Sequence, residues 1–408
     1  MSGSKRTISR RGFLSAAGGS LLSAGLLNLN PAITLAEGAD DKADGSSKEI
    51  IYRKLGRTDI HVPIVSIGVM NSENPEIIQA SYEIGVRYFN LSGNYQLGRI
   101  ETVAAGVLNK LQVRDKVIIG TGNDDVEAFA GLSASECKRK ITAACEASLS
   151  RLKTDYIDIY YVWEGHDPRN THNPAMLEAL EYLKQQQKIR HAGVSMHSNM
   201  AEAINAVADG GYFDVVMTTF NFTLSDDSKL LAAIKNAAAK GVGVIAMKMM
   251  AGGSRWPNES SRRDHSSAAI ATACIKWVLR NPAVSTSVPG FMSYEHMRQD
   301  FSVARDLEYT PEEERFLSDN SVKLGMGFCR QCKSCLAYCP KKVDIPTLMR
   351  VHMYAAQYGD LYRARVTLDS ISSGSDLRVC KDCSTCRAIC ANSVEIASRI
   401  DELKAIYT

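Results

Sequence analysis

Neither sign of charge dominates this chain, and cysteine is scarce over most of its length. Its 408 residues contain 48 Lys and Arg against 45 Asp and Glu. Four of the basic residues and none of the acidic ones lie in residues 1–36, so the rest of the chain holds 44 basic and 45 acidic residues. This near-neutral balance gives no compositional reason to expect nucleic-acid binding. Only Cys137, Cys145 and Cys274 precede residue 329, and their helical patterns predict that they are buried in the core.

The last eighty residues, in contrast, hold eight cysteines in two similar brackets. The first bracket consists of Cys329, Cys332, Cys335 and Cys339. The second consists of Cys380, Cys383, Cys386 and Cys390. Each has the spacing C-x2-C-x2-C-x3-C and resembles the run by which bacterial-type ferredoxins hold [4Fe–4S] clusters. Three thiolates this close in sequence can bind three corners of one cluster from a tight loop, whereas the fourth thiolate must come from elsewhere.

The resemblance to two-cluster ferredoxins implies that the brackets exchange their fourth ligands. One [4Fe–4S] cluster would be held by Cys329, Cys332, Cys335 and Cys390. The other would be held by Cys380, Cys383, Cys386 and Cys339. Zinc sites and disulfides are the alternatives, but neither explains a third and a fourth cysteine at fixed spacing twice over. We therefore expect two [4Fe–4S] clusters and a role in electron transfer.

Residues 1–36 have the layout of an export signal. Arg10 and Arg11 stand in the string S-R-R-G-F-L, which resembles the twin-arginine class of signal peptides. The stretch that follows is poor in strongly apolar residues and short for a membrane span, although retention as an uncleaved anchor is the alternative. As a family, these signals carry folded and often cofactor-loaded proteins. We therefore expect the twin-arginine export machinery as a partner, a periplasmic location, and a disordered linker over residues 37–48.

Residues 49–321 have the length expected of a (β/α)8 barrel. Short apolar, β-branched runs alternate with helical patterns such as 135–152 and 174–184, which predicts a parallel sheet covered by helices. Eight such runs predict closure into a barrel. They are 64–70, 86–91, 116–121, 156–163, 191–196, 214–220, 242–248 and 284–290. A doubly wound open sheet is the alternative, but no G-x-G-x-x-G follows the first run.

Several segments of this region resemble the aldo/keto reductase family. They include Y-R-K-L-G-R-T-D-I-H-V-P (52–63), G-V-R-Y-F-N-L-S-G-N-Y (85–95) and G-V-G-V-I-A-M-K-M-M-A-G-G (241–253). The resemblance covers nearly the whole predicted TIM barrel and implies an active site at the C-terminal ends of its strands. Some members of that family carry a C-terminal two-cluster domain. Helical patterns at 345–358 and 360–371 fit a small, mainly α-helical ferredoxin-type domain over residues 322–408.

The family's catalytic set of Asp, Tyr, Lys and His is mostly missing. The tyrosine, which donates a proton to the substrate carbonyl in the family, is retained as Tyr95. Asn90 stands at the Asp position, Gly122 at the Lys position and Trp163 at the His position. An unperturbed phenol titrates near ~10, so the loss of neighbouring positive charge matters for its acidity.

The contacts to a nicotinamide cofactor are also eroded. Ser195 keeps a family position that contacts the carboxamide and is the expected cofactor-binding residue. Met196, Met217 and Met292 stand where the family has Asn, Gln and a basic residue for the 2′-phosphate. We therefore do not expect a conventional NADPH-dependent reductase, and binding of NADP(H) is in doubt.

The expected catalytic residues are Tyr95, Asn90 and Lys248. Lys248 ends the seventh run, where burial of a barrel lysine lowers its pKa, although a packing role is the alternative. Four further polar residues follow the fourth and fifth runs and could serve acid–base chemistry or bind a metal, unless they are simply solvated. They are Glu164, His166, Asp167 and His197.

Two functions follow from these patterns. The first is an exported oxidoreductase that binds a small-molecule substrate at the barrel mouth and exchanges electrons through its clusters with a periplasmic carrier. Scarcity of soluble NADPH outside the cytoplasm fits the eroded cofactor contacts. The second is a non-catalytic barrel whose iron–sulfur module transfers electrons or docks within a larger redox complex. Polar residues retained at the mouth, Tyr95 and Lys248 among them, favour the first.

Overall fold

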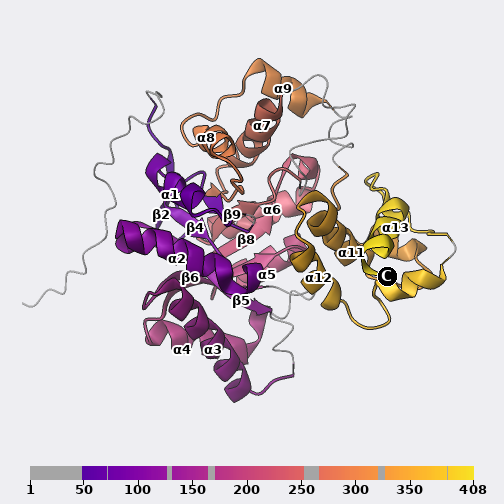
Figure 1. The fold of residues 1–408 in the computed structure, drawn as a ribbon, viewed down its shortest axis with the longest axis horizontal. Helices are drawn as coiled ribbons and strands as arrows, with labels where there is room; N and C mark the ends of the chain where they lie inside the picture. Colours follow the sequence, from indigo (N-terminus) through magenta and orange to yellow (C-terminus); the bar gives the residue numbers. More distant parts are fainter. Residues whose placement is uncertain are drawn as a thin grey trace, which may run out of the picture. The chain divides into compact units, whose positions relative to one another are not determined.

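The computed structural model describes residues 48–70, 72–125, 131–163, 171–251, 266–319, 327–383 and 385–408 (Figure 1). All of these residues belong to one compact unit. The predicted signal peptide over 1–36 and nearly all of the predicted linker lie outside the described residues. Within the described ranges, no helix is both long and apolar enough to cross a membrane.

Eight parallel strands form one sheet, and each lies within one of the eight runs predicted from the sequence or overlaps it. They are β3 (Ile67–Gly68), β4 (Tyr88–Asn90), β5 (Ile118–Asp125), β6 (Ile157–Trp163), β7 (Ile189–Met196), β8 (Val215–Thr219), β9 (Gly243–Met247) and β10 (Thr286–Ser287). Each strand pairs with the next one in the chain. A parallel bridge between Val65 and Ser287 joins the two edges, so the sheet closes into a nearly complete barrel. The prediction of a (β/α)8 barrel is confirmed.

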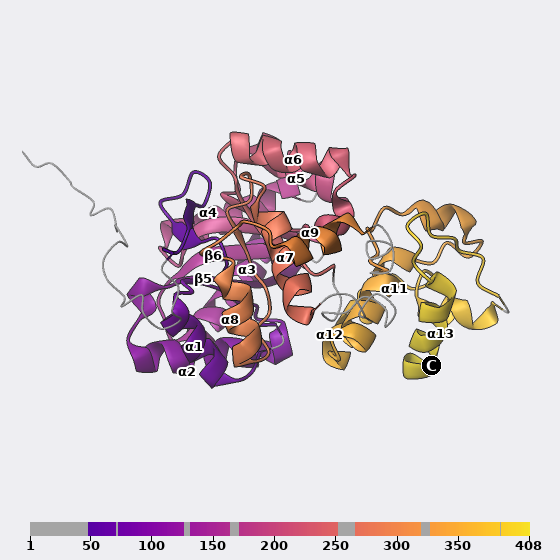
Figure 2. The same ribbon diagram turned by 90° about the horizontal axis from the view of Figure 1, so that it is seen from above.

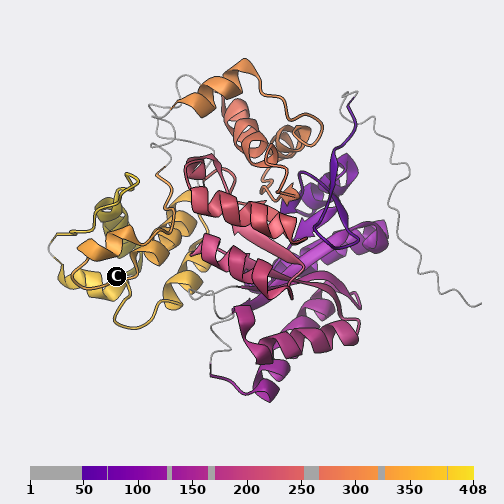
Figure 3. The same cartoon turned by 180° about the vertical axis from the view of Figure 1, so that it is seen from behind.

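The helices that follow these strands cover the outside of the barrel (Figures 1 and 3). They are α1 (Pro75–Ile84), α2 (Arg99–Leu111), α3 (Ala134–Leu152), α4 (Pro174–Gln185), α5 (Met200–Gly210), α6 (Ser228–Ala239), α7 (Ser267–Leu279) and α8 (Tyr294–Ser302). Side chains cap several of the helix starts; Ser133 and Glu136, for example, form a reciprocal capping box at α3. The ring closes where α8 lies beside α1 (Figure 2). Cys137, Cys145 and Cys274 are fully buried, as predicted.

An antiparallel hairpin covers the N-terminal end of the barrel. It consists of β1 (Tyr52–Lys54) and β2 (His61–Pro63). Leu55 and Val62 are fully buried in a cluster with inward-facing residues of the strands. Gly56 adopts a φ of +57°, and a Cβ there would lie 2.2 Å from the backbone nitrogen of Gly243, so this close approach requires glycine. The hairpin therefore closes this end of the barrel.

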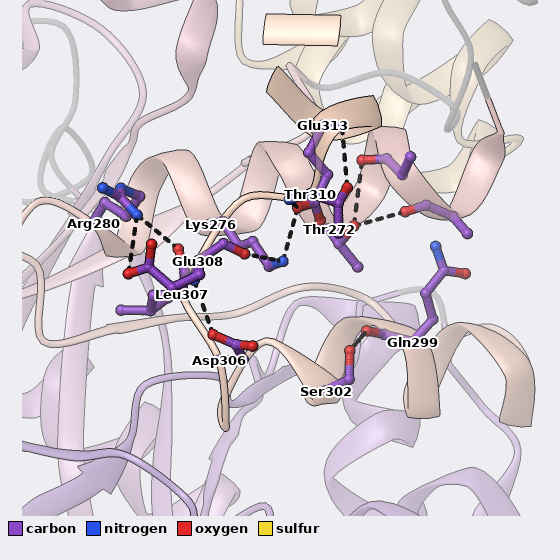
Figure 4. A network of polar contacts seen from close by, with 12 residues as sticks. Thr272, Lys276, Arg280, Gln299, Ser302, Asp306, Leu307, Glu308, Thr310 and Glu313 are labelled. Atoms are coloured by element: carbon purple, nitrogen blue, oxygen red, sulfur yellow. Dashed lines mark hydrogen bonds and ion pairs between the residues drawn. The ribbon is translucent and has the colours of Figure 1, made fainter. Parts of the chain in front are cut away.

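A buried ion pair fixes α9 (Pro311–Ser318) against α7. Lys276 Nζ donates to Glu313 Oε2 at 2.8 Å and to the carbonyl oxygen of Glu308 at 2.7 Å (Figure 4). Burial would raise the pKa of Glu313, but hydrogen bonds and the charge of Lys276 outweigh it and lower this pKa. Glu313 also completes a capping box with Thr310 at the start of α9. Each buried charge thus has the partner that it needs away from water.

The C-terminal segment is helical and has its own hydrophobic cluster, in which Leu348, Ala364 and Leu403 are fully buried. Its helices are α11 (Ile345–His352), α12 (Leu361–Asp369) and α13 (Ile396–Tyr407). A π-helical turn, η7 (Met353–Gln357), extends α11. The helices predicted over 345–358 and 360–371 are therefore present. Turns of the π type interrupt regular hydrogen bonding and often occur at functional sites.

Candidate active site

A cavity of about 430 Å³ lies at the C-terminal ends of the barrel strands, and we call it the barrel-mouth cavity. It is lined by Met70, Leu91, Ser92, Tyr95, Gly122, Tyr161, Trp163, Ser195, His197, Met217, Met247, Lys248, Tyr354 and Arg363. Twelve of these residues come from the barrel, and Tyr354 and Arg363 come from the C-terminal segment. A hydrogen-bonded register places Trp163, Ser195 and Met217 side by side on β6, β7 and β8. Three positions expected from the family resemblance therefore lie together.

Asn90, which occupies the family's Asp position, is buried beneath the mouth and does not line the cavity. Its Oδ1 accepts a hydrogen bond from Tyr88 Oη at 3.1 Å, and the hydroxyls of Tyr88 and Tyr161 are 3.0 Å apart. Burial raises the pKa of both phenols, so both stay neutral at physiological pH. A chain of uncharged groups therefore stands where the family has an Asp–Lys pair.

The backbone itself excludes the family's lysine at position 122. A Cβ on Gly122 would lie 1.9 Å from the carbonyl oxygen of Tyr161, a distance that no side chain tolerates. The register between β5 and β6 shifts between Thr121 and Asp124, so this close approach lies at an irregularity of the strand pairing. Gly122 is therefore required by the local strand pairing.

Tyr95, the one retained member of the family's set, begins a short 3-10 turn, η1 (Tyr95–Gly98), and lines the cavity. Burial raises the pKa of its phenol to about 12, and the positive charge of Arg363 opposes this rise only in part. The helix α12 packs against η1, so the C-terminal segment contacts the turn that carries Tyr95.

Lys248 and Tyr354 form a second pair of a cation and a phenol in the same cavity. Lys248 follows β9 in a left-handed backbone conformation with a φ of 58°, which is uncommon outside glycine and typical of functional sites. Its Nζ lies 3.5 Å from Tyr354 Oη, a long hydrogen bond, and 5.3 Å from the centre of the ring. Burial lowers the pKa of Lys248, although Tyr354 opposes this effect.

Of the tyrosines named above as lining the barrel-mouth cavity, Tyr354 has the phenol with the lowest pKa. Burial would raise its pKa, but the positive charges of Lys248, Arg363 and Arg350 outweigh burial and lower the pKa to about 8. Burial and, to a smaller extent, the charges of the same three cations hold the pKa of His197 well below its ordinary value. His197 is therefore neutral at physiological pH.

Two further cavities lie between the barrel mouth and the cysteines and share lining residues. The bridging cavity, about 360 Å³, shares His197 and Lys248 with the barrel-mouth cavity and also reaches Cys329. The cysteine cavity, about 330 Å³, shares Cys329 and Met349 with the bridging cavity. Each cavity therefore has residues in common with the next, from the strand ends to the first cysteine bracket.

The cysteine cavity is lined by Cys329, Cys332, Cys335 and Cys390. Cys390 of the second bracket thus joins three cysteines of the first. In the same way, Cys380 is close enough to Cys339, Cys383 and Cys386 for their charges to affect its pKa, which burial raises to about 11. Over the described part of the chain, no three His, Cys, Asp or Glu side chains are grouped so as to hold a single metal ion.

The remaining predicted residues have varied positions. Glu164, His166 and Asp167 lie outside the described residues. Met196 is fully buried, and Met292 is exposed at the surface. Three residues of the C-terminal segment were not predicted, namely Tyr354, Arg350 and Arg363. The residue spacing within a helix does not indicate that the helix contacts a barrel mouth formed by residues about 100 positions earlier in the chain. The π-helical turn that carries Tyr354 is visible in the structure and is not marked by any motif quoted from the sequence.

Comparison with known proteins identifies the family. Residues 66–269, half of the chain, match the aldo/keto reductase family. The uncharacterized oxidoreductase YqkF of Bacillus subtilis is 24% identical over 301 residues, covering 66% of this chain and 96% of that protein. L-galactose dehydrogenase of Arabidopsis thaliana is 23% identical over 305 residues, covering 66% of this chain and 93% of that protein.

Solved structures share the fold. Aldo-keto reductase AKR11C1 from Bacillus halodurans, in its holo form, superposes with a TM-score of 0.52 at 22% identity, over 66% of this chain and 95% of that one. The thermostable aldo-keto reductase Tm1743 in complex with epalrestat gives a TM-score of 0.53 at 19% identity, over 67% of this chain and 100% of that one. The chain belongs to the aldo/keto reductase family and is an oxidoreductase of the aldo/keto reductase type.

Proposed function

We propose that the protein is an exported iron–sulfur oxidoreductase. It interconverts a carbonyl and an alcohol at the barrel mouth and exchanges electrons with two [4Fe–4S] clusters in the C-terminal segment. The observation that carries this proposal is the series of three adjoining cavities. His197 and Lys248 are common to the first two, and Cys329 is common to the last two. A substrate at the strand ends would therefore lie close to the first cysteine bracket.

The cysteine arrangement fits the donor set that two such clusters need. Four thiols surround the cysteine cavity, and the fourth of them, Cys390, comes from the other bracket. This is the exchange that the resemblance to two-cluster ferredoxins implies. The residues that would hold the second cluster are Cys380, Cys383, Cys386 and Cys339. When bound, each cluster supplies one-electron transfer, and two such centres match the two electrons of a carbonyl/alcohol couple.

In this proposal the protein's own side chains carry out the proton transfer. Reduction of a carbonyl to an alcohol takes two electrons, which would come from the clusters, and two protons. We propose Tyr354 as the group that gives one proton to the carbonyl oxygen, while water supplies the proton that forms the C–H bond. In the reverse direction Tyr354 takes the hydroxyl proton, the carbon loses its proton to water, and both electrons pass to the clusters.

The ammonium of Lys248, 3.5 Å away, stabilises the phenolate form of Tyr354. Efficient acid–base catalysis needs a pKa near the working pH, and the value of about 8 for Tyr354 meets this need better than the value of about 12 for Tyr95. Tyr95 lines the same cavity and contributes to substrate orientation.

NADP(H) is not the electron donor in this proposal. The strand pairing excludes a lysine at Gly122, and apolar side chains stand at Trp163 and Met217, where the family has polar residues. Ser195 alone keeps a cofactor-contacting position. We propose instead that electrons pass to or from a periplasmic redox protein or small carrier. Export would proceed through the twin-arginine machinery, which receives folded proteins, so that clusters can be assembled before translocation.

An anaerobic redox titration tests this proposal. The full chain is produced under iron-replete conditions, assayed for iron and sulfide, and reduced with dithionite while absorbance and paramagnetic signals are followed. We expect about eight irons per chain and signals of two reducible clusters. Neither NADPH nor NADH should reduce them.

Two results would contradict the proposal. Zinc in place of iron would remove the electron-transfer role of the cysteines. Reduction of the clusters by NADPH would show that the altered mouth still accepts a hydride donor. A matched control is Cys274→Ala, because this thiol is buried in the barrel core and should leave the iron content unchanged.

A further inference from the structure

Among the residues that the structure describes, two of the three guanidinium nitrogens of the buried Arg363 at the barrel mouth have no polar partner. The residue is 6% exposed, and its buried Nε and Nη1 make no hydrogen bond to any residue within the described ranges. Its Cζ lies over the indole of Trp163 at 4.1 Å from the ring centre, and 5.8 Å from the centre of the Tyr354 ring. Arg363 also lines the barrel-mouth cavity. Two aromatic rings thus hold a charged fork in position and leave its donors unused.

Such an arrangement is costly unless an anion completes it. A buried charge is ordinarily paired with an opposite charge or with hydrogen bonds, because water no longer solvates it. Contact with aromatic faces compensates for only part of that loss. An unpaired buried guanidinium beside a cavity therefore indicates a ligand that carries the missing acceptors.

The surroundings of Arg363 are positive as well. Lys248 lines the same cavity, and Arg350 lines the bridging cavity next to it. Among the described residues, no Asp or Glu lines either cavity. The shared field of these three cations reaches both His197 and Tyr354. The ligand should accordingly be negatively charged.

The rest of the barrel-mouth cavity sets the character of the ligand. Its lining has the make-up of a small-molecule site, with a few polar groups among apolar and aromatic side chains. Its other walls are mostly apolar or aromatic, including Met70, Leu91 and Met247. A small organic acid, with a carbon body on these walls and its carboxylate at Arg363, satisfies both features.

We infer that the substrate is a small hydroxy or oxo carboxylic acid, whose carboxylate binds Arg363 by two parallel N–H···O bonds while its hydroxyl or carbonyl oxygen faces Tyr354. A planar carboxylate matches the guanidinium fork, whereas a lone ammonium offers only a point charge. This assignment of a substrate class rests on the proposed function for the reacting group. The binding of the carboxylate itself does not depend on electron transfer.

Binding of matched acids and amides to the full, cluster-loaded chain tests the inference. Lactate and mandelate are compared by calorimetry with lactamide and mandelamide, which have nearly the same shape but no charge. We expect at least one of the acids to bind about 10-fold to 100-fold more tightly than its amide, because a hydrogen bond to a charged group is worth about 1.5–3 kcal/mol. Arg363→Met should abolish this preference. Arg363→Lys should keep only part of it.

The matched control is Arg365→Met, two residues further along α12. Arg365 is exposed and pairs with Asp369, so its loss should leave the binding of acids and amides unchanged. If no acid binds more tightly than its amide in the unmodified chain, the inference is wrong, whether or not the Arg363 variants fold. Inorganic phosphate that displaces the acids at equal concentration would refute the assignment to a carboxylate. The proposed function fails separately, if the bound acid neither reduces nor oxidises the clusters.

Discussion

The phenol of Tyr354 offers a direct test of the charge arrangement at the barrel mouth. Its pKa of about 8 lies two units below the ordinary value of 10, a difference of about 3 kcal/mol in favour of the phenolate. At pH 8 about half of this side chain should be ionised, compared with about 1% of an ordinary tyrosine. Because the pKa of Tyr354 is lower in the folded chain than in the unfolded chain, its ionisation raises the free energy of unfolding as the pH rises from about 8 to about 10. Below about pH 8 the ionisation adds no stability.

The assay is the tyrosinate absorbance of the unmodified chain minus that of Tyr354→Phe, followed against pH. The neighbouring phenols do not interfere, since burial raises the pKa of Tyr95 to about 12 and raises that of Tyr358 further. We expect a one-tyrosine transition centred near pH 8. Lys248→Met should move that transition to pH 10 or above, because burial still acts on the phenol after its closest cation is lost.

Lys248→Arg is the conservative control, since it retains a positive charge and should leave the transition below pH 9. The variant Tyr354→Phe should also abolish turnover while the iron content stays the same, and Tyr95→Phe should lower turnover less. The absence of any tyrosine transition below pH 9 in the unmodified chain would refute the reasoning. So would a transition that Lys248→Met does not move.

Three further predictions concern the rest of the molecule. Glu313→Gln leaves the ammonium of Lys276 buried without its carboxylate and should cost about 3–5 kcal/mol in the free energy of unfolding, measured with denaturant. The pKa of Glu313 is lower in the folded chain than in the unfolded chain. The stability that its charge supplies is therefore fully present above the pKa of the unfolded state and is lost as the pH falls through the pKa of the folded state. Gly122→Lys, which restores the family's residue, should destabilise the barrel by about 1–3 kcal/mol and yield no NADPH oxidation. Cys390→Ala should remove the cluster expected at the cysteine cavity and about half of the iron.

Each of these predictions has a result that would contradict it. Arg365→Gln breaks an exposed pair with Asp369 and should change stability little; an effect as large as that of Glu313→Gln would mean that burial does not decide the cost. NADPH turnover by Gly122→Lys would show that β5 and β6 can separate to admit a lysine. Full iron content in Cys390→Ala would exclude the exchange of ligands between the brackets.

Much of the barrel follows from local patterns. Eight apolar runs predicted eight strands, because buried parallel strands need nearly continuous apolar sequence and the connecting helices need one apolar face. The ends of the strands were less predictable. β10 is confined to Thr286–Ser287 within a predicted run of seven residues, and β5 continues to Asp125, beyond its predicted run. Pairing with neighbouring strands decides these limits, and a single run carries no information about its neighbours.

The site was predictable only in part, for a similar reason. Trp163 and Ser195 line the cavity because their places in the sequence fix their places at the strand ends, and Tyr95 lines it from the turn that follows β4. The contact between Lys248 and Tyr354 spans 106 residues and depends on how the C-terminal segment packs, which no local pattern encodes. Asn90 differs again: its position was correctly placed on β4, but hydrogen bonding to Tyr88 keeps its side chain below the cavity.

The chemistry of the family needs a phenol that a neighbouring cation makes acidic. Any tyrosine and any cation that lie close together at the barrel mouth can meet this requirement. In this chain the strand pairing leaves no room for a lysine at Gly122. The charge of Arg363 opposes only part of the effect of burial, so the pKa of Tyr95 is raised. A phenol with a lowered pKa is nevertheless present, formed by Tyr354 beside Lys248, and one of its two members comes from the segment that carries the cysteines. Any displacement of that segment would change the distance between phenol and cation. Occupancy of the cysteine brackets and acidity at the barrel mouth should therefore be coupled, and removal of iron should raise the pKa of Tyr354.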